Sequence, residues 1–181
     1  MKVFFISDLH FDGSKLLSVR KEFESLDEMN GYMINQWNSV VRKEDEVYIV
    51  GDLVDKECND PMKFVTCLNG KKHLIVGNHD VWVDKDVRPL KVFESISNFK
   101  CVNIDDYKVT LCHYPLIEWP DSINDEMSIH IHGHINTRKE RLAYKIIRKK
   151  CIRAYNASVD VNGLPVTIDE LIRNNKKWYG W

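Results

Sequence analysis

Five short clusters of Asp, Asn and His contain the residues of this sequence that could bind metal ions. In chain order the clusters are Asp8-Leu9-His10, Gly51-Asp52-Leu53-Val54-Asp55, Gly77-Asn78-His79-Asp80, His113 and His132-Gly133-His134. They supply carboxylate, imidazole and amide ligands but no thiolate. Such a mixed set of nitrogen and oxygen donors favours Mn²⁺, Fe or Zn²⁺ over a soft ion. It contains too many imidazoles for Ca²⁺ or Mg²⁺ alone.

The candidate ligands are numerous enough for a pair of metal ions. Two ions roughly 3.5–4 Å apart need one bridging ligand and about three further ligands each. Each cluster alone also has an ordinary structural interpretation. Gly-Asp after a strand is usually a turn, and a single histidine such as His113 is more often a core or surface residue. The occurrence of all five clusters together favours one functional site.

The elements that must position these clusters alternate between strands and helices, which predicts an α/β fold. Apolar runs predict strands at 2–6, 46–50, 72–76, 100–104, 107–112 and 128–132. The fourth and fifth are expected to form a hairpin around Asp105-Asp106. Each of the other four, and the second arm of the hairpin, ends at one of the clusters. Because ligands in sheet-based α/β folds collect where strand ends meet loops, we expect the clusters to converge.

Capping patterns predict where the helices begin. Ser25 and Glu28 form a capping-box pattern ahead of apolar residues at helical spacing. Asp60-Pro61 predicts the start of a second helix that ends before Gly70. Another capping box predicts a C-terminal helix; it consists of Thr167 and Glu170. The aromatic residues near the end of the chain are expected to pack on the core; they are Trp178, Tyr179 and Trp181.

The composition is typical of a globular protein, and we expect one domain over residues 1–181. Of the 181 residues, 44% are hydrophobic and 29% are charged, and the net charge is −1. This balance gives no general attraction to nucleic acid or to a membrane. The five cysteines include no Cys-x-x-Cys pair, which argues against a disulfide framework and a Cys-rich zinc site. The N-terminal apolar run is too short for a signal peptide or a membrane span, so we expect a cytoplasmic location and no membrane partner.

A basic segment lies near the last cluster. It contains eight cationic residues that only Glu140 offsets, namely Arg138, Lys139, Arg141, Lys145, Arg148, Lys149, Lys150 and Arg153. One interpretation is a surface that binds a nucleotide or RNA, whose affinity would fall steeply with salt. The other is a solvated β-hairpin or helix.

In their order along the chain, the clusters resemble the motifs of the calcineurin-like metallophosphoesterases. These motifs are Asp-x-His, Gly-Asp-x-x-Asp, Gly-Asn-His followed by Asp or Glu, a single His, and Gly-His-x-His. The resemblance extends from Asp8 to about Asn136. Neighbouring residues are similar to small bacterial and phage members, for instance Leu68-Asn69-Gly70-Lys71-Lys72 and Cys112-His113-Tyr114-Pro115. The resemblance implies a four-layer α/β/β/α sandwich.

The resemblance also implies two sets of metal ligands that share one residue. The first metal would be bound by Asp8, His10 and Asp52, and the second by Asp52, Asn78, His113 and His134.

Three further residues would support these ligands, according to the resemblance. His79 would lie beside the substrate phosphate without binding a metal. Asp55 would orient or polarise His79 from behind, and Asp80 would brace its own loop.

The last motif departs from the family pattern. Where the family has Gly-His-x-His, this chain reads Gly133-His134-Ile135-Asn136. Asn136 could complete the first metal site through its amide oxygen, or leave that place to water. His132 is the rival, because residues two apart share a face of a strand. We favour Asn136, and we expect His130 to be structural.

The resemblance implies a metal-dependent phosphoesterase that acts on phosphomonoesters or phosphodiesters. Two divalent ions, with Mn expected and Fe, Zn or Ni as alternatives, would lower the pKa of water and supply hydroxide near neutral pH. His79, if protonated, would donate a proton to the departing oxygen as a general acid. A nuclease or a cyclic-nucleotide phosphodiesterase is the alternative within the family. A non-catalytic protein-interaction scaffold is the alternative outside catalysis, and it conflicts with the retained ligands and His79.

Overall fold

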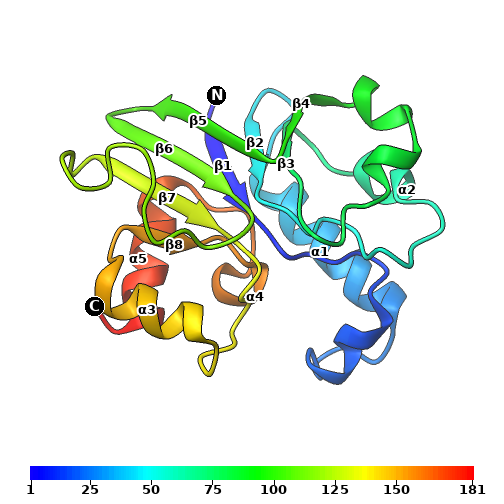
Figure 1. The fold of residues 1–181 in the computed structure, drawn as a ribbon. Helices are drawn as coiled ribbons and strands as arrows, with labels where there is room; N and C mark the ends of the chain where they lie inside the picture. Colours follow the sequence, from blue (N-terminus) through cyan, green and yellow to red (C-terminus); the bar gives the residue numbers. More distant parts are fainter.

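Two four-stranded sheets face each other in the structure, and helices lie on the outer side of each sheet (Figure 1). The computed structural model describes all residues, 1–181. In the first sheet the strand order is β1-β2-β3-β4, and every neighbouring pair is parallel. Its strands are β1 (Val3–Ile6), β2 (Glu46–Ile49), β3 (Lys71–Ile75) and β4 (Phe93–Ser97).

The second sheet has the order β5-β6-β7-β8. Its strands are β5 (Phe99–Ile104), β6 (Tyr107–Cys112), β7 (Ser128–His132) and β8 (Ala154–Asn156). The first two form the predicted antiparallel hairpin, in which Ile104 pairs with Tyr107 around the Asp105-Asp106 turn. The strands β6, β7 and β8 are parallel to one another. The carboxyl ends of β6 and β7 therefore lie at the same edge of this sheet.

Five α-helices and three short 3₁₀ helices connect the strands. The α-helices are α1 (Leu26–Val40), α2 (Met62–Val65), α3 (Leu142–Lys150), α4 (Val159–Asn162) and α5 (Ile168–Tyr179). The 3₁₀ helices are η1 (Ser14–Ser18), η2 (Val83–Lys85) and η3 (Arg88–Lys91). Helix α5 begins at the capping box of Thr167 and Glu170 that its sequence predicts.

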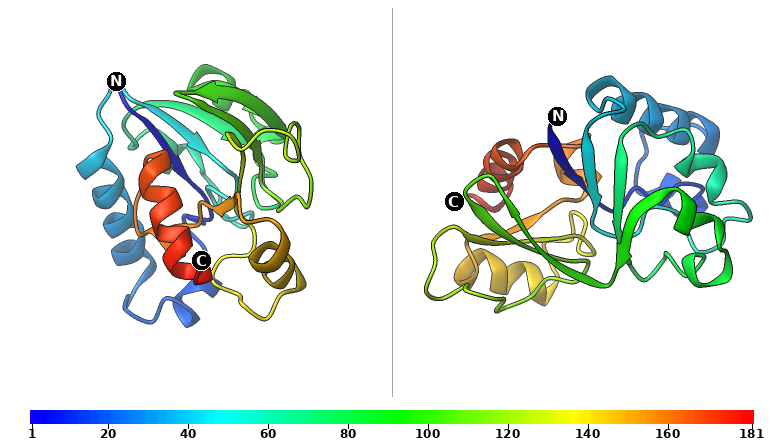
Figure 2. Two further views of the ribbon diagram at one scale, coloured as in Figure 1. Left: turned by 90° about the vertical axis from the view of Figure 1, so that its left-hand side faces the viewer. Right: turned by 90° about the horizontal axis from the view of Figure 1, so that it is seen from above.

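Three apolar clusters separate four layers. Alternate residues of a strand point to opposite faces of its sheet, so Phe4 of β1 packs against α1 while Phe5 faces the second sheet. Between the sheets, Phe5 belongs to the same cluster as Leu111 of β6 and Ile131 of β7. On the outer side of the second sheet, α3 and the end of α5 contribute to a third cluster, which includes Tyr179. The predicted α/β/β/α sandwich is confirmed, and Figure 2 shows its layers from two further sides.

Several local predictions were incomplete. Strands β4 and β8 were not anticipated, and the basic segment that could have been a hairpin forms helix α3. Helix α2 is a single turn, and its N-cap is Pro61, without a side-chain cap. The Asp60 carboxylate instead accepts a hydrogen bond from Arg88 Nη2 at 3.1 Å. At α1 the Ser25 hydroxyl accepts from Glu28 N, but the Glu28 carboxylate accepts from Glu24 N, so the box is not reciprocal.

The C-terminal aromatic residues pack on the core as predicted. Tyr179 is only 1% exposed and stacks on Trp181 with ring centroids 4.4 Å apart. The Trp178 ring packs edge-on against Tyr144 of α3. None of the helices has both the length and the apolar character that a membrane span requires.

Candidate metal centre

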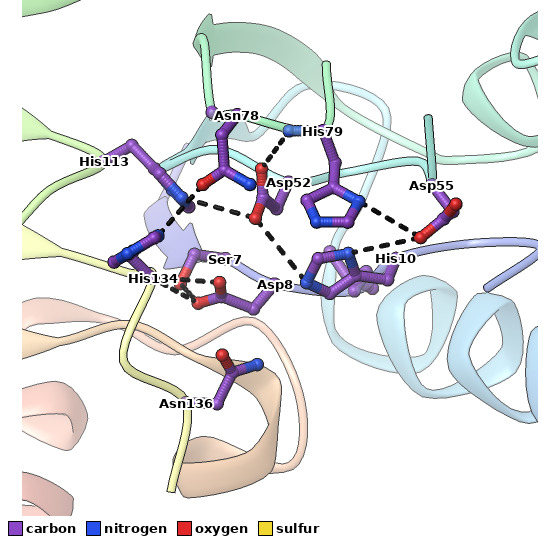
Figure 3. Close-up of polar contacts among 12 residues, drawn as sticks. Ser7, Asp8, His10, Asp52, Asp55, Asn78, His79, His113, His134 and Asn136 are labelled. Carbon is purple, nitrogen blue, oxygen red and sulfur yellow. Dashed lines mark hydrogen bonds and ion pairs between the residues drawn. The ribbon is translucent and has the colours of Figure 1, made fainter. Parts of the chain in front are cut away.

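The polar side chains at the carboxyl ends of β1, β2, β3, β6 and β7 meet at one place, as Figure 3 shows. The Asp52 carboxylate lies at the middle of the group. Its Oδ2 is 3.6 Å from His10 Nε2 and 3.3 Å from His113 Nε2. Its Oδ1 accepts a hydrogen bond from the main-chain amide of His79 at 2.8 Å. Ligands from both sheets thus converge on one carboxylate.

Two groups of three side chains have their potential ligand atoms within 4.8 Å of one another. One group is His10, Asp52 and His79, and the other is Asp52, His113 and His134. Asp52 belongs to both groups, as a bridging ligand must. Burial lowers the pKa of His10 to about 4, so its imidazole is neutral near pH 7 and can bind a cation.

His113 fits a metal ligand by its hydrogen bonding. The side chain is fully buried, and its Nδ1 lies 2.9 Å from the Val50 carbonyl oxygen, which can only accept. The opposite nitrogen, Nε2, is buried without a hydrogen-bond partner and faces Asp52. Burial lowers the pKa of His113, but Asp52 and Asp8 outweigh it and raise the pKa to about 9. Without a cation, a proton therefore occupies the position where a metal would bind.

Asp8 is likewise a buried carboxyl group, whose ionised form a cation would stabilise. Its Oδ2 accepts from Ser7 Oγ at 2.6 Å, and both carboxylate oxygens accept from His134 N, at 3.0 and 3.2 Å. Burial raises the pKa of Asp8 to about 7, because nearby hydrogen bonds do not replace its lost hydration. Asp8 belongs to neither of the two three-residue groups. It lies next to them, through its hydrogen bond with the main chain of His134.

Asn78 and His134 are in contact. Asn78 Oδ1 lies 2.9 Å from His134 Nδ1, which joins the end of β3 to the end of β7. Burial, then the charges of His113 and Arg141, lower the pKa of His134 to about 4. The half-exposed ring of Tyr114 packs against His134 with centroids 4.8 Å apart.

His79 and Asp55 form a pair at the side of the site. His79 Nδ1 lies 3.1 Å from Asp55 Oδ2, and the ring packs edge-on against His10 with centroids 4.5 Å apart. The His79 side chain is 25% exposed, so solvent and a ligand can reach it. The Asp55 carboxylate thus contacts one ring nitrogen of His79 and leaves the other free for a ligand, as the sequence-based role of a proton donor requires. The same ring also lies close enough to His10 and Asp52 to belong to their group.

The three candidate residues near the last motif, His130, His132 and Asn136, have different surroundings. His132 is fully buried, its Nδ1 lies 2.9 Å from the Gly133 carbonyl oxygen, and its Nε2 has no hydrogen-bond partner, but it belongs to neither three-residue group. His130 accepts from Leu116 N at Nε2 and contacts the Thr110 carbonyl through Nδ1, so both its ring nitrogens are satisfied inside the protein. Asn136 instead lies below Asp8 in Figure 3.

Sequence spacing did not reveal two residues that support the site, the buried Arg20 and the partly buried Asp160. Arg20 is 4% exposed and donates to the carbonyl oxygens of Asp8, at 2.8 Å, and Leu9, at 2.9 Å. Its Nε donates to Asp160 Oδ1 at 2.8 Å. Neither Arg20 nor Asp160 belongs to one of the five clusters, and β8, the strand that precedes Asp160, was itself not predicted.

Two glycines of the motifs are required by close packing. A Cβ at Gly77 would lie 2.3 Å from Asp52 Oδ1 and 2.5 Å from Asp52 N. A Cβ at Gly51 would lie 2.2 Å from His113 Nδ1, and its φ of +87° also disfavours other residues. The glycines therefore make room for the side chains that would bind the metals.

A four-layer α/β/β/α sandwich with Asp, Asn and His ligands at the strand ends of both sheets defines the metallophosphoesterase type of fold. The chain belongs to the calcineurin-like phosphoesterase superfamily, whose domain model matches residues 1–147. The superfamily is metal-dependent, in agreement with the Asp and His groups of the site.

Two relatives span nearly the whole chain. The chain is 31% identical to uncharacterized protein MJ1445 of Methanocaldococcus jannaschii over 176 residues, covering 95% of this chain and 90% of the relative. It is 27% identical to Gene 66 protein of Mycobacterium phage L5, covering 92% and 90%. Among solved structures, a protein of unknown function from Aquifex aeolicus, AQ665, has the same fold, with a TM-score of 0.71 and 24% identity over 94% of this chain and 97% of that one.

Proposed function

We propose that this protein hydrolyses phosphate esters with two divalent cations, Mn²⁺ being the expected metal and Fe, Zn or Ni the alternatives. The observation that supports this most is the position of Asp52, which is shared by two ligand groups drawn from both sheets. Superfamily membership supports the hydrolase class. The proposed ligands are Asp8, His10, Asp52 and Asn136 for the first cation, and Asp52, Asn78, His113 and His134 for the second.

The cations, when bound, would supply Lewis-acid activation of water and neutralise charge on the phosphoryl oxygens. The remaining steps belong to residues of the chain. Asp55 holds His79 Nδ1, so the ring presents Nε2 to the site, and Nε2 donates the proton that the departing oxygen needs. Asp80, through its contacts to main-chain amides, holds the loops that position Asp52 and Asn78.

A direct test combines metal analysis with turnover of p-nitrophenyl phosphate and bis-p-nitrophenyl phosphate. We expect two metal ions per chain and hydrolysis of at least one ester, with both lost in Asp52→Asn. Faster turnover of the first ester would indicate a phosphomonoesterase, and faster turnover of the second would indicate a phosphodiesterase. Two bound metals without turnover of either ester would favour the scaffold alternative.

The second candidate is a phosphodiesterase that acts on nucleotides or nucleic acid. Seven cationic residues form no ion pair and follow His134 along a loop and helix α3; they are Arg138, Lys139, Arg141, Lys145, Arg148, Lys149 and Lys150. Arg153 differs from them, because its guanidinium donates to the carbonyl oxygens of Ser122 and Asp125.

This candidate predicts a substrate larger than one phosphate. The double variant Lys145→Glu with Lys149→Glu should weaken hydrolysis of an oligonucleotide. The difference from wild type should shrink with added salt, because the release of each counterion from the nucleic acid is less favourable when the salt concentration is high. Turnover of bis-p-nitrophenyl phosphate should not change. The matched control is Lys21→Glu with Lys43→Glu, two exposed lysines outside this segment. Equal effects of the two pairs would contradict a dedicated surface.

A further inference from the structure

A largely buried ion pair, between Arg20 and Asp160, contacts the side chain of Asn136. The side chain of Arg20 is 5% exposed and that of Asp160 is 18% exposed, and they come from opposite parts of the chain. Three acceptors fix the guanidinium of Arg20: Asp160 Oδ1 and the carbonyl oxygens of Asp8 and Leu9. Asp160 is therefore held rigidly relative to the main chain that bears Asp8.

The other carboxylate oxygen of Asp160 fixes the orientation of the Asn136 amide. Asn136 Nδ2 donates to Asp160 Oδ2 at 3.3 Å. A carboxylate offers only acceptors, so the amide must direct its NH₂ group to Asp160 and its oxygen away from it. In Figure 3 this oxygen is directed toward Asp8. The main chain is also fixed, because the Asn136 carbonyl oxygen accepts from Asn156 Nδ2 at 2.9 Å.

We propose that Arg20 and Asp160 are positioning residues that hold the Asn136 amide oxygen toward the first metal position. This rests on the proposed function, since it requires a site for two cations. Without Asp160, rotation about the last side-chain bond would expose the NH₂ group, which cannot bind a metal. The ion pair thus lets an amide replace the imidazole that the family motif has at this place.

The proposal has a consequence for the choice of metal. The first position would have oxygen donors from Asp8, Asp52 and Asn136 and one imidazole from His10, whereas the second would have two imidazoles. Oxygen-rich sets favour Mn²⁺ or Mg²⁺, and imidazole favours Zn²⁺ and Fe. We therefore expect the first position to prefer a harder cation than the second.

The experiment is a titration of the full-length, metal-free chain with Mn²⁺, followed by calorimetry and by the electron paramagnetic resonance signal of free Mn²⁺. Wild type should bind two ions. Asp160→Asn should weaken one of the two positions about 10-fold or more, the usual effect of losing a group that orients a ligand, and leave the other unchanged. In this variant an NH₂ group replaces one of the two carboxylate oxygens, so either Arg20 Nε or Asn136 Nδ2 would face a donor in place of its present acceptor.

Two further variants separate positioning from general damage. Asn136→Ala should weaken the same position, and adding Asp160→Asn to it should cause no further loss, because Asp160 acts through Asn136. The matched control is Asp86→Asn, which alters another Arg–Asp pair, with Arg88 Nε at 2.6 Å, that contacts no proposed ligand. It should bind both ions like wild type.

The outcomes distinguish the two proposals. Wild type that binds fewer than two Mn²⁺ ions overturns the proposed function and this inference with it. Two ions in wild type and in Asp160→Asn, with equal affinities, overturn the inference alone. Weakening of both positions, or a further loss in the double variant, shows a structural role for the ion pair and also overturns it. Thermal unfolding of each variant shows which of them fold normally.

Discussion

The Asp80 carboxylate accepts hydrogen bonds from three main-chain amides beside the proposed metal positions. The donors are Asp52 N at 2.7 Å, Leu53 N at 3.0 Å and Gly77 N at 2.9 Å. Burial raises the pKa of Asp80, and the three amides oppose that effect by stabilising the ionised form. One side chain therefore ties the loop after β2 to the loop after β3, beyond the local brace that the sequence suggested.

His79 is the residue whose loss should separate catalysis from metal binding. Since Nε2 is the proposed proton donor, His79→Ala should lower turnover by about 10²-fold or more, the usual contribution of a positioned acid. Metal content should stay near two ions per chain. The measurement is steady-state kinetics together with metal analysis of the same sample. Loss of one metal with the activity would make His79 a ligand, as its place beside His10 and Asp52 also permits.

Gly77 should be intolerant of even a methyl group. Because a Cβ there would lie 2.3 Å from Asp52 Oδ1, Gly77→Ala must displace the carboxylate or the loop. We expect a loss of both metals, and destabilisation by about 1–3 kcal/mol from overpacking. Metal analysis and urea unfolding check this. Gly31→Ala is a useful comparison, because its Cβ would meet no atom within 4 Å and its φ, like that of Gly77, is not positive. Normal metal binding by Gly77→Ala would contradict the packing argument.

Among the elements, strand β7 presents different chemistry on its two faces. Ile129 and Ile131 face the other sheet, whereas His130 and His132 alternate with them and are fully buried on the outer side. Burial lowers the pKa of His130 to about 4. The folded protein thus keeps this imidazole neutral at a pH where the unfolded chain would bind a proton.

The stability of the metal-free protein should depend on pH through His130. Its pKa in the folded state lies below the ordinary value of 6.5, so its contribution is fully present above pH 6.5 and is lost as the pH falls toward 4. Between pH 7.5 and pH 5 we expect a decrease of about 2 kcal/mol in the free energy of unfolding from this residue. Urea unfolding of wild type and His130→Gln at both pH values measures it. An equal decrease in the two proteins would exclude His130 as the source.

The elements that the sequence revealed are those with a strong apolar run or a cap. Strands β1, β2 and β3 were predictable because most of their residues are buried, and a proposed ligand lies in the loop that follows each strand. Strands β4 and β8 are the outermost strands of their sheets. The first is only partly buried, and the second has three residues, so neither gives a clear pattern. The contact between Arg20 and Asp160 could not be predicted from the sequence, because these residues are 140 positions apart and only the fold brings them together.

At the scale of the whole molecule, the candidate metal centre lies where the carboxyl edges of the two sheets meet. Asp8, Asp52 and Asn78 follow strands of the first sheet, whereas His113 and His134 follow strands of the second. Cations held by both sets would connect the sheets at their carboxyl edge. The metals would therefore stabilise the fold as well as serve the chemistry.

Saturating metal should raise the melting temperature. A ligand at 100 times its Kd stabilises the folded state by about 2.7 kcal/mol, which for a chain of this size corresponds to about 5–10 °C. Calorimetry with Mn²⁺ and with a chelator measures the shift. Asp52→Asn should lose most of it, since both positions share that carboxylate. A melting temperature independent of Mn²⁺ would argue against ligands from both sheets.

The division of the ligands between the sheets also orders events during synthesis. A ribosome that has made the first hundred residues has joined Asp8, His10, Asp52 and Asn78 to the chain but neither His113 nor His134. Such a nascent chain contains three of the four proposed ligands of the first cation but only two of the four of the second, so we expect it not to retain a pair of ions. For the proposed two-metal enzyme, competence would arise only when the second sheet docks, which would couple activity to completion of the fold.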